Sequence, residues 1–199
     1  MICVLFQSDA RSVTIIRHPM TRFVSGFFYR AHSPNWDRFN IRAYFSSDPT
    51  YPFKFSFDLY LEMPEYHNIL VKMFAQDKFP YYNATLKQRD LDLATDRLSR
   101  FIVVGINEAY DASVQLLLAE FGVNLREDQI HQPPMMSSTY ANDYHEFKNG
   151  RLKQDEALRQ RIRENNRFDI GLYEWALPRF CTQLKLRSLQ THDTYRICK

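Results

Sequence analysis

Hydrophobic residues along the chain follow two patterns that alternate. One is a short continuous run, and the other is a set of residues at helical spacing. Residues 12–16 and 101–106 are short, continuous and rich in β-branched residues, which is typical of strands buried on both faces. Pro19 follows the first run closely and suits the first turn of a helix. Four apolar residues then recur at helical spacing: Phe23, Val24, Phe27 and Phe28. The pattern therefore predicts a strand, a tight turn and a helix over residues 12–30.

A helix is also predicted after the second short run, in the sequence NEAYDASVQLLLAEFG. Asn107 suits the cap of this helix, and Gly122 suits its end. Glu108 and Asp111 fit its first turns, where acidic residues are favourable. Two strand-to-helix units of this kind favour an α/β fold with a parallel sheet flanked by helices. Two strands make a poor sheet, so either this chain contains further strands or the rest of the sheet lies outside it.

The remaining segments divide into helices and loops. Three are predicted to be helical: 56–76 with an interruption near Pro64, 86–99, and 151–180 with a break near residues 165–166. Residues 31–55 read as a long irregular excursion, and residues 123–150 as a polar loop. We find no internal repeat and expect a single domain over residues 1–199.

Composition narrows the class of protein. The chain has 199 residues, of which 45% are hydrophobic, and this suffices for one domain with a substantial core. A net charge of +3 suits an anionic ligand but is small for a nucleic-acid binder, so we expect no nucleic-acid partner. No segment has the apolar length of a transmembrane helix.

The three cysteines leave two interpretations open. Either Cys181 and Cys198 close a loop in an oxidising compartment and leave Cys3 over, or all three are unpaired thiols. Their spacing indicates no metal site, and we expect no metal. The triplet that begins at Asn83 matches a glycosylation acceptor, but such triplets are common by chance, so it favours a secretory lumen only slightly.

Arg17 is the first candidate for ligand binding. It stands at the carboxyl end of the first predicted strand, the edge at which parallel sheets bind ligands. Unpaired amides at the start of the following helix would also attract an anion there. Ser25 lies eight residues further on, about two helical turns, so its hydroxyl can face the same pocket. The pattern indicates a phosphate clamp; the alternative is an Arg that is solvated or paired with a carboxylate, with an exposed Ser.

The stretch TIIRHPMTRFVSGFFYR resembles the 3′-phosphate-binding segment of the carbohydrate sulfotransferases. That family's pattern is an apolar strand, then Arg-Asp-Pro, a short spacer, a second Arg, a Ser and an aromatic cluster. The matching residues here are Arg17, Pro19, Arg22 and Ser25. His18 stands where the family usually has Asp.

Later stretches resemble the same family in the same order: SFDLYLEMPEYHNILVKMF, DLATDRLSRFIVVGINEAYDASVQLLLAEFG and FDIGLYEWALPRF. Together they are similar to the branch of the heparan and uronyl 2-O-sulfotransferases and the galactose 3-O-sulfotransferases. This resemblance implies a P-loop-NTPase-like sulfotransferase fold. It further implies transfer of a sulfuryl group from 3′-phosphoadenosine 5′-phosphosulfate (PAPS) to a hydroxyl of a glycan acceptor.

The resemblance assigns the 3′-phosphate of PAPS to Arg17 and Ser25. Gly105 and Glu108, in the Val-Gly-x-x-Glu sequence, fit packing and helix capping better than ligand binding. Residues 137–139, Ser-Ser-Thr, fall where the family sends a loop over the nucleotide.

Two parts of the family's active site are not seen in this sequence. A phosphate loop with Gly and a basic residue should precede the Arg17 segment, as should the general base, often a His. The stretch MICVLFQSDARSVTII contains no Gly, Lys or His. We therefore expect the domain to be incomplete at its amino terminus, name no catalytic residue, and interpret the six histidines as surface or packing residues.

Two other functions are weighed against the sulfotransferase. One is a P-loop-type phosphotransferase, although the sequence contains no G-x-x-x-x-G-K-[ST] motif. The other is a non-catalytic remnant that binds a nucleotide or a partner. The resemblance also implies the lumenal side of the Golgi membrane, with attachment only through an amino-terminal anchor missing from this sequence.

Overall fold

A computed structural model of the chain describes residues 3–4, 12–31, 57–75, 85–123, 138–189 and 192–198. The strands are β1 (Cys3–Val4), β2 (Val13–Ile16) and β3 (Val103–Ile106). The helices are α1 (Pro19–Ala31), α3 (Phe57–Glu62), η2 (Pro64–Tyr66), α4 (Ile69–Ala75), α5 (Gln88–Ser99), η3 (Asn107–Ala109), α6 (Tyr110–Glu120), α8 (Ser138–Asn149), α9 (Arg151–Gln154), α10 (Glu156–Asn165), α11 (Arg167–Leu186) and α12 (His192–Ile197).

The three strands form one sheet in the order β1-β2-β3. β2 and β3 pair in parallel, from Val13 opposite Val103 to Ile16 opposite Ile106, which confirms the predicted α/β class and parallel pairing. β1 was not predicted, and it pairs antiparallel with β2 at the edge of the sheet. A strand of two residues has no detectable alternation, so its pairing depends on the neighbouring strand.

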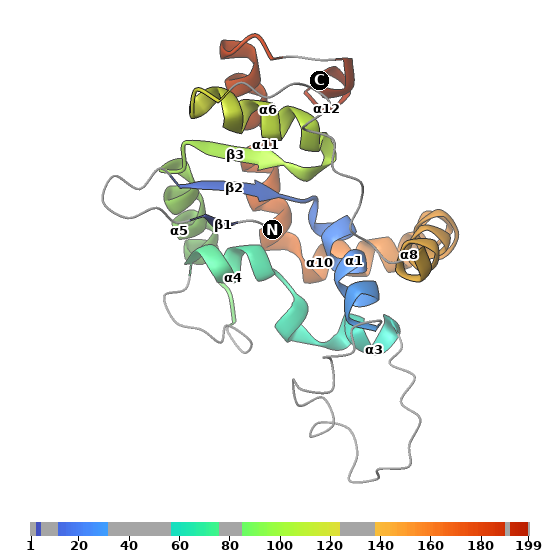
Figure 1. The fold of residues 1–199 in the computed structure, drawn as a ribbon. Coiled ribbons are helices and arrows are strands. Elements are labelled where there is room, and N and C mark those ends of the chain that lie inside the picture. Colours follow the sequence, from blue (N-terminus) through green and yellow to red (C-terminus); the bar gives the residue numbers. More distant parts are fainter. Residues whose placement is uncertain are drawn as a thin grey trace.

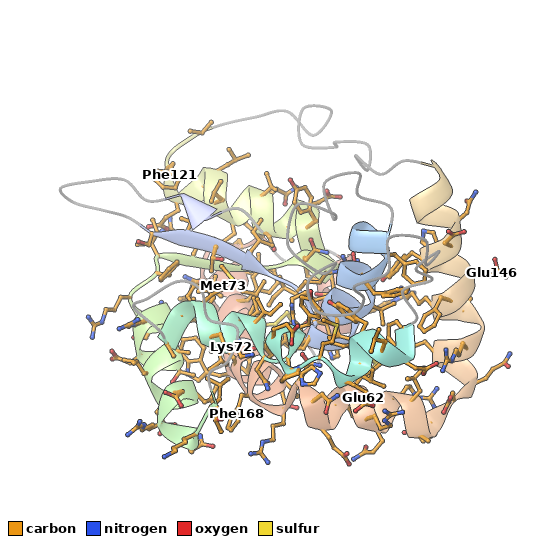
Figure 2. The ribbon with its side chains drawn as sticks, turned by 90° about the horizontal axis from the view of Figure 1, so that it is seen from below. Glu62, Lys72, Met73, Phe121, Glu146 and Phe168 are labelled. Carbon is orange, nitrogen blue, oxygen red and sulfur yellow. A yellow bond between two sulfur atoms is a disulfide. The ribbon has the colours of Figure 1, made fainter. Side chains whose placement is uncertain are left out.

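The helices cover the sheet and extend beyond its carboxyl edge. Figure 1 shows α11 passing behind the strands, and α1 leaving the end of β2 toward α8. One cluster of buried residues joins the sheet to α4, α5, α6 and α11, and a second joins α1 to α3, α8, α9 and α10. Figure 2 shows the side chains that fill the space between these elements, with exposed residues such as Glu146 at the periphery. The site predicted at Arg17 lies where the two clusters meet.

Two predicted interruptions of helices are confirmed. The helical region around Pro64 divides into α3, η2 and α4, because Pro64 begins a new 3-10 turn. The break near residues 165–166 separates α10 from α11 at Asn166. The predicted excursion at 31–55 lies, apart from the helical Ala31, outside the described residues.

The prediction of a loop over residues 123–150 is wrong for its second half, because Ser138–Asn149 form α8. This helix has few apolar residues, so its sequence alone gives little helical signal. Tyr144 is only 4% exposed, and its ring packs edge-on against Phe28, 6.2 Å between ring centroids. Burial of aromatic side chains against α1 stabilises α8, which local propensity does not.

Gly105 lets α6 approach β3 closely. A Cβ at this position would lie 2.8 Å from the Cβ of Ser113 and 3.0 Å from Cγ1 of Ile15, closer than carbon atoms pack. The Ser113 hydroxyl bonds both the N–H and the carbonyl of Ile106, each at 2.8 Å. The predicted packing role of Gly105 is therefore confirmed.

The ends of the second strand-to-helix unit differ in part from the prediction. Asn107 belongs to the 3-10 turn η3 and makes no capping hydrogen bond, so its predicted cap is wrong. Gly122 has a φ of 67° just after α6 and ends the helix as predicted. Among the helices described here, none combines the length and the apolar character that crossing a bilayer requires.

Cys181 and Cys198 form a disulfide, with 5.5 Å between their Cα atoms. It joins α11 to the residue that follows α12. Of the two interpretations left open by the sequence, the structure has the paired one. The side chain of Cys3 and the triplet at Asn83 lie outside the described part of the chain.

Candidate functional site

The two residues predicted to bind phosphate lie against each other. Arg17 follows β2 directly, and Ser25 lies two turns into α1. Nη1 of Arg17 donates a hydrogen bond of 3.0 Å to the Ser25 hydroxyl. Because α1 begins two residues after Arg17 and runs away from the strand, the long Arg side chain follows the helix to reach Ser25.

A third residue joins them that sequence reasoning missed. Nη2 of Arg17 lies 3.5 Å from the hydroxyl oxygen of Tyr144, and its Cζ lies 5.8 Å from the centroid of the Tyr144 ring. Tyr144 belongs to α8, a region predicted to be a loop. No local signal marks Tyr144 as a site residue, because only the packing of α8 on α1 brings it to Arg17.

Arg17 and Arg22, the two half-buried arginines of the motif, differ in the groups that their guanidinium groups contact. In the described part of the chain, no carboxylate lies within 4.0 Å of Arg17, and its buried Nε has no hydrogen-bond partner. Arg22 also has an unpartnered Nε, but its charge is compensated by Asp169 at 3.1 Å. A half-buried guanidinium whose hydrogen-bond partners are hydroxyl groups is suited to an anionic ligand.

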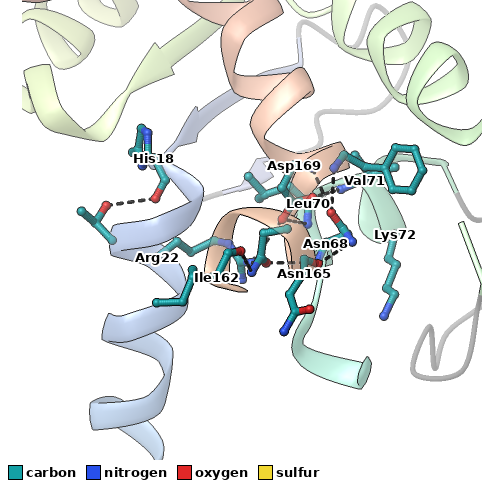
Figure 3. Close-up of polar contacts among 12 residues, drawn as sticks. His18, Arg22, Asn68, Leu70, Val71, Lys72, Ile162, Asn165 and Asp169 are labelled. Carbon is teal, nitrogen blue, oxygen red and sulfur yellow. Dashed lines mark hydrogen bonds and ion pairs between the residues drawn. The ribbon is translucent and has the colours of Figure 1, made fainter. Parts of the chain in front are cut away.

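Arg22 serves the fold, as Figure 3 shows. Its Nη2 donates to Asp169 at 3.1 Å and to the side-chain oxygen of Asn166 at 3.3 Å. Asp169 is fully buried, and burial raises the pKa of its carboxyl group, whereas Arg22 and two backbone amides favour the charged form. The second Arg of the motif thus ties α1 to α11.

Asp169 and Asn68 cap each other's helices. The Asp169 carboxylate accepts hydrogen bonds from the N–H groups of Leu70 and Val71, at the start of α4, at 3.1 and 2.8 Å. The Asn68 side-chain oxygen accepts from the N–H groups of Phe168 and Asp169, at the start of α11. Each side chain satisfies amides that helix geometry leaves unpaired. Figure 3 shows the two helix ends facing each other through these residues.

Glu108 caps α1 rather than its own helix. Its carboxylate accepts from the backbone N–H of His18, at 3.0 and 3.2 Å for the two oxygens, and from the hydroxyls of Thr21 and Tyr173. The predicted capping role of Glu108 is confirmed, but the helix that it caps is α1 rather than α6. Of the amides at the start of α1, that of His18 is already bonded to a carboxylate, so this helix end attracts a further anion less than the sequence suggests. The Arg17 side chain is therefore the main attraction for an anion at this place.

The described histidines near this region take part in packing. The His18 ring lies edge-on to Tyr173, 5.0 Å between centroids, and Nε2 of His67 lies 2.9 Å from the carbonyl oxygen of Leu61. Burial lowers the pKa of both imidazoles, so both are neutral near pH 7. Among the described residues, neither is a hydrogen-bond partner of the Arg17 side chain, whose partners are Ser25 and Tyr144.

A family model described as "Sulfotransferase family" matches residues 5–176. This match covers most of the chain and includes Arg17, Ser25 and Tyr144. The chain belongs to the sulfotransferase family. No curated protein and no solved structure gives a significant match.

Membership in the sulfotransferase family implies transfer of a sulfuryl group to an acceptor. The group of Arg17, Ser25 and Tyr144 offers what an oxyanion needs, one fixed positive charge and two hydroxyl groups. Within the described ranges, no three His, Cys, Asp or Glu residues are arranged to hold a metal ion. Ser137 and the side chains of Ser138 and Thr139, predicted to cover the nucleotide, lie outside the described part of this sulfotransferase chain.

Proposed function

We propose that this sulfotransferase uses PAPS as its donor and that Arg17 and Ser25 bind the donor's 3′-phosphate. The observation that carries this proposal is the hydrogen bond between the two side chains, at the carboxyl end of a parallel strand, where no carboxylate of the described residues pairs with the arginine. PAPS differs from common nucleotides in its 3′-phosphate. A site built for that group would select the sulfate donor over ATP.

The chemistry of the two residues suits this ligand. A guanidinium presents a planar fork of donors that matches two phosphate oxygens. The Ser25 hydroxyl adds a donor beside the fork, and its 9% exposure keeps competing water low. Held by its 3′-phosphate, the nucleotide would be oriented for in-line transfer of its sulfuryl group to an acceptor hydroxyl.

A glycan is the acceptor class that we propose. The support is the resemblance of the ordered sequence stretches to the heparan and uronyl 2-O-sulfotransferases and the galactose 3-O-sulfotransferases. In the transfer, the bond from sulfur to the 5′-phosphate oxygen breaks and a bond to the acceptor oxygen forms, while the acceptor proton passes to a base.

The donor proposal is tested by calorimetry of the full chain with two nucleotides. We expect 3′-phosphoadenosine 5′-phosphate, the product of the donor, to bind at least ten times more tightly than adenosine 5′-phosphate. The physical reason is that each hydrogen bond to the charged 3′-phosphate contributes about 1.5–3 kcal/mol to the binding free energy. Adenosine 5′-phosphate lacks this group and cannot make these bonds. Equal affinities, or equal binding of ATP, would refute a 3′-phosphate site.

We also propose that the protein works in an oxidising lumen, such as that of the Golgi. The support is the disulfide of Cys181 and Cys198, because disulfides persist mainly in secretory compartments. We expect peptide mapping without reduction, on protein made through a secretory route, to recover the two cysteines as one cross-linked peptide. Alkylation of both thiols in that protein before reduction would contradict the proposal.

A further inference from the structure

We propose that the hydroxyl group of Tyr144 is a third ligand of the donor's 3′-phosphate, brought to the site by α8. This inference rests on the proposed donor function and adds a residue to it. Its structural basis is the position of Tyr144 beside a guanidinium that bonds hydroxyl groups and, within the described residues, pairs with no carboxylate.

Two hydroxyl groups lie next to the two terminal nitrogens of the Arg17 guanidinium. Ser25 lies 3.0 Å from Nη1 of Arg17, and Tyr144 lies 3.5 Å from Nη2. An oxyanion that accepts from both terminal nitrogens binds along the edge that these nitrogens share. The two hydroxyls then flank the oxyanion, and each is able to donate to it. The distance to Tyr144 is at the upper limit for a hydrogen bond, so an oxyanion that competes for the guanidinium displaces only a weak contact.

Packing fixes the Tyr144 hydroxyl in place before a ligand binds. The ring is 4% exposed and contacts Phe28 of α1 at 6.2 Å between centroids. A buried ring with two side-chain torsions loses little entropy when its hydroxyl binds a ligand, and a low local dielectric strengthens that bond. Tyr144 is therefore preorganised in the way that a selective anion site requires.

Charge around the ring supports the same interpretation. Lys148, one turn further along α8, places its Nζ 5.9 Å from the centroid of the Tyr144 ring, and Cζ of Arg17 lies 5.8 Å from the same centroid. Two cations near one ring raise the local positive potential, which attracts an anion. The electrostatics at the α1–α8 contact thus favour a ligand with more than one negative charge, as a terminal phosphate has.

The test removes only the hydroxyl. We expect Tyr144→Phe to weaken binding of 3′-phosphoadenosine 5′-phosphate about tenfold, the loss of one hydrogen bond to a charged group. Binding of adenosine 5′-phosphate should not change, because it lacks the 3′-phosphate. The matched control is Tyr66→Phe, since Tyr66 is buried in the same core cluster, 7% exposed, and stacks on Tyr60. Among the described residues it is not a hydrogen-bond partner of Arg17. Tyr66→Phe should bind both nucleotides as the original chain does.

The outcomes separate this inference from the donor proposal. If the original chain shows no preference for the 3′-phosphate, the donor proposal fails. If it does show the preference, and Arg17→Ala abolishes it while Tyr144→Phe keeps it, the inference about Tyr144 is wrong. Should Tyr144→Phe not fold, hydrogen exchange of the original chain decides. The 3′-phosphorylated nucleotide should slow exchange in α8 and adenosine 5′-phosphate should not; equal exchange with both nucleotides overturns the inference.

Discussion

Replacing Arg17 by alanine is expected to weaken binding of 3′-phosphoadenosine 5′-phosphate by about 100-fold or more, because two hydrogen bonds to a charged phosphate are lost together. Sulfuryl transfer from PAPS should fall at least as far. The fold should change little, since in the described part of the chain Arg17 pairs with no carboxylate that its removal would leave unpaired. Calorimetry measures the affinity, and thermal unfolding without ligand measures the stability.

Two variants sharpen this experiment. Arg17→Lys keeps the charge but loses the planar fork, so its affinity should fall between those of the original chain and Arg17→Ala. Arg163→Ala is the control for removing a positive charge, because Arg163 is exposed and pairs with Glu156 at 2.9 Å on α10. Its nucleotide affinity should not change. An Arg17→Ala protein that still prefers the 3′-phosphorylated nucleotide would contradict the site.

The second large effect concerns stability. Replacing Asp169 by alanine is expected to reduce the free energy of unfolding by about 3–5 kcal/mol, the usual result of breaking a buried ion pair. The substitution leaves Arg22 without its carboxylate and the N–H groups of Leu70 and Val71 without an acceptor. Since a domain is stable by about 5–15 kcal/mol in total, the loss is a large part of it. Denaturant unfolding measures it.

An exposed ion pair of the same chemistry provides the control. Arg151 and Asp58 lie 2.7 Å apart, with 44% and 56% of their side chains exposed. Asp58→Ala should therefore cost only about 0–1 kcal/mol. Equal costs for Asp58→Ala and Asp169→Ala would show that the buried network does not hold the helices as we infer.

Substitutions of the two arginines of the motif are therefore expected to have different effects. Arg17 should change ligand affinity with little effect on stability, whereas Arg22 should change stability, because it anchors Asp169. Sequence pattern alone treats them as two basic residues of one segment. The difference depends on Asp169, which is 147 residues away in the chain from Arg22.

The amino-acid sequence by itself determined the local elements and one half of the site. Continuous β-branched runs predicted β2 and β3, and helical spacing with Pro19 predicted α1 directly behind Arg17. Once that strand and helix form, eight residues of helix geometry bring Ser25 under the Arg17 side chain. These relations are short in sequence, so a periodic pattern suffices to predict them.

The tertiary structure decided everything that depends on distant residues. It brought Tyr144 from a segment that reads as a loop, gave Glu108 a different helix to cap, and paired Arg22 with Asp169. The physical reason is that the burial of apolar faces packs distant helices together and thereby determines which polar side chains meet. Contacts of this kind produce no periodic pattern in the sequence. Local geometry therefore set the strand-to-helix clamp, and packing between distant helices decided which charges stayed available for a ligand.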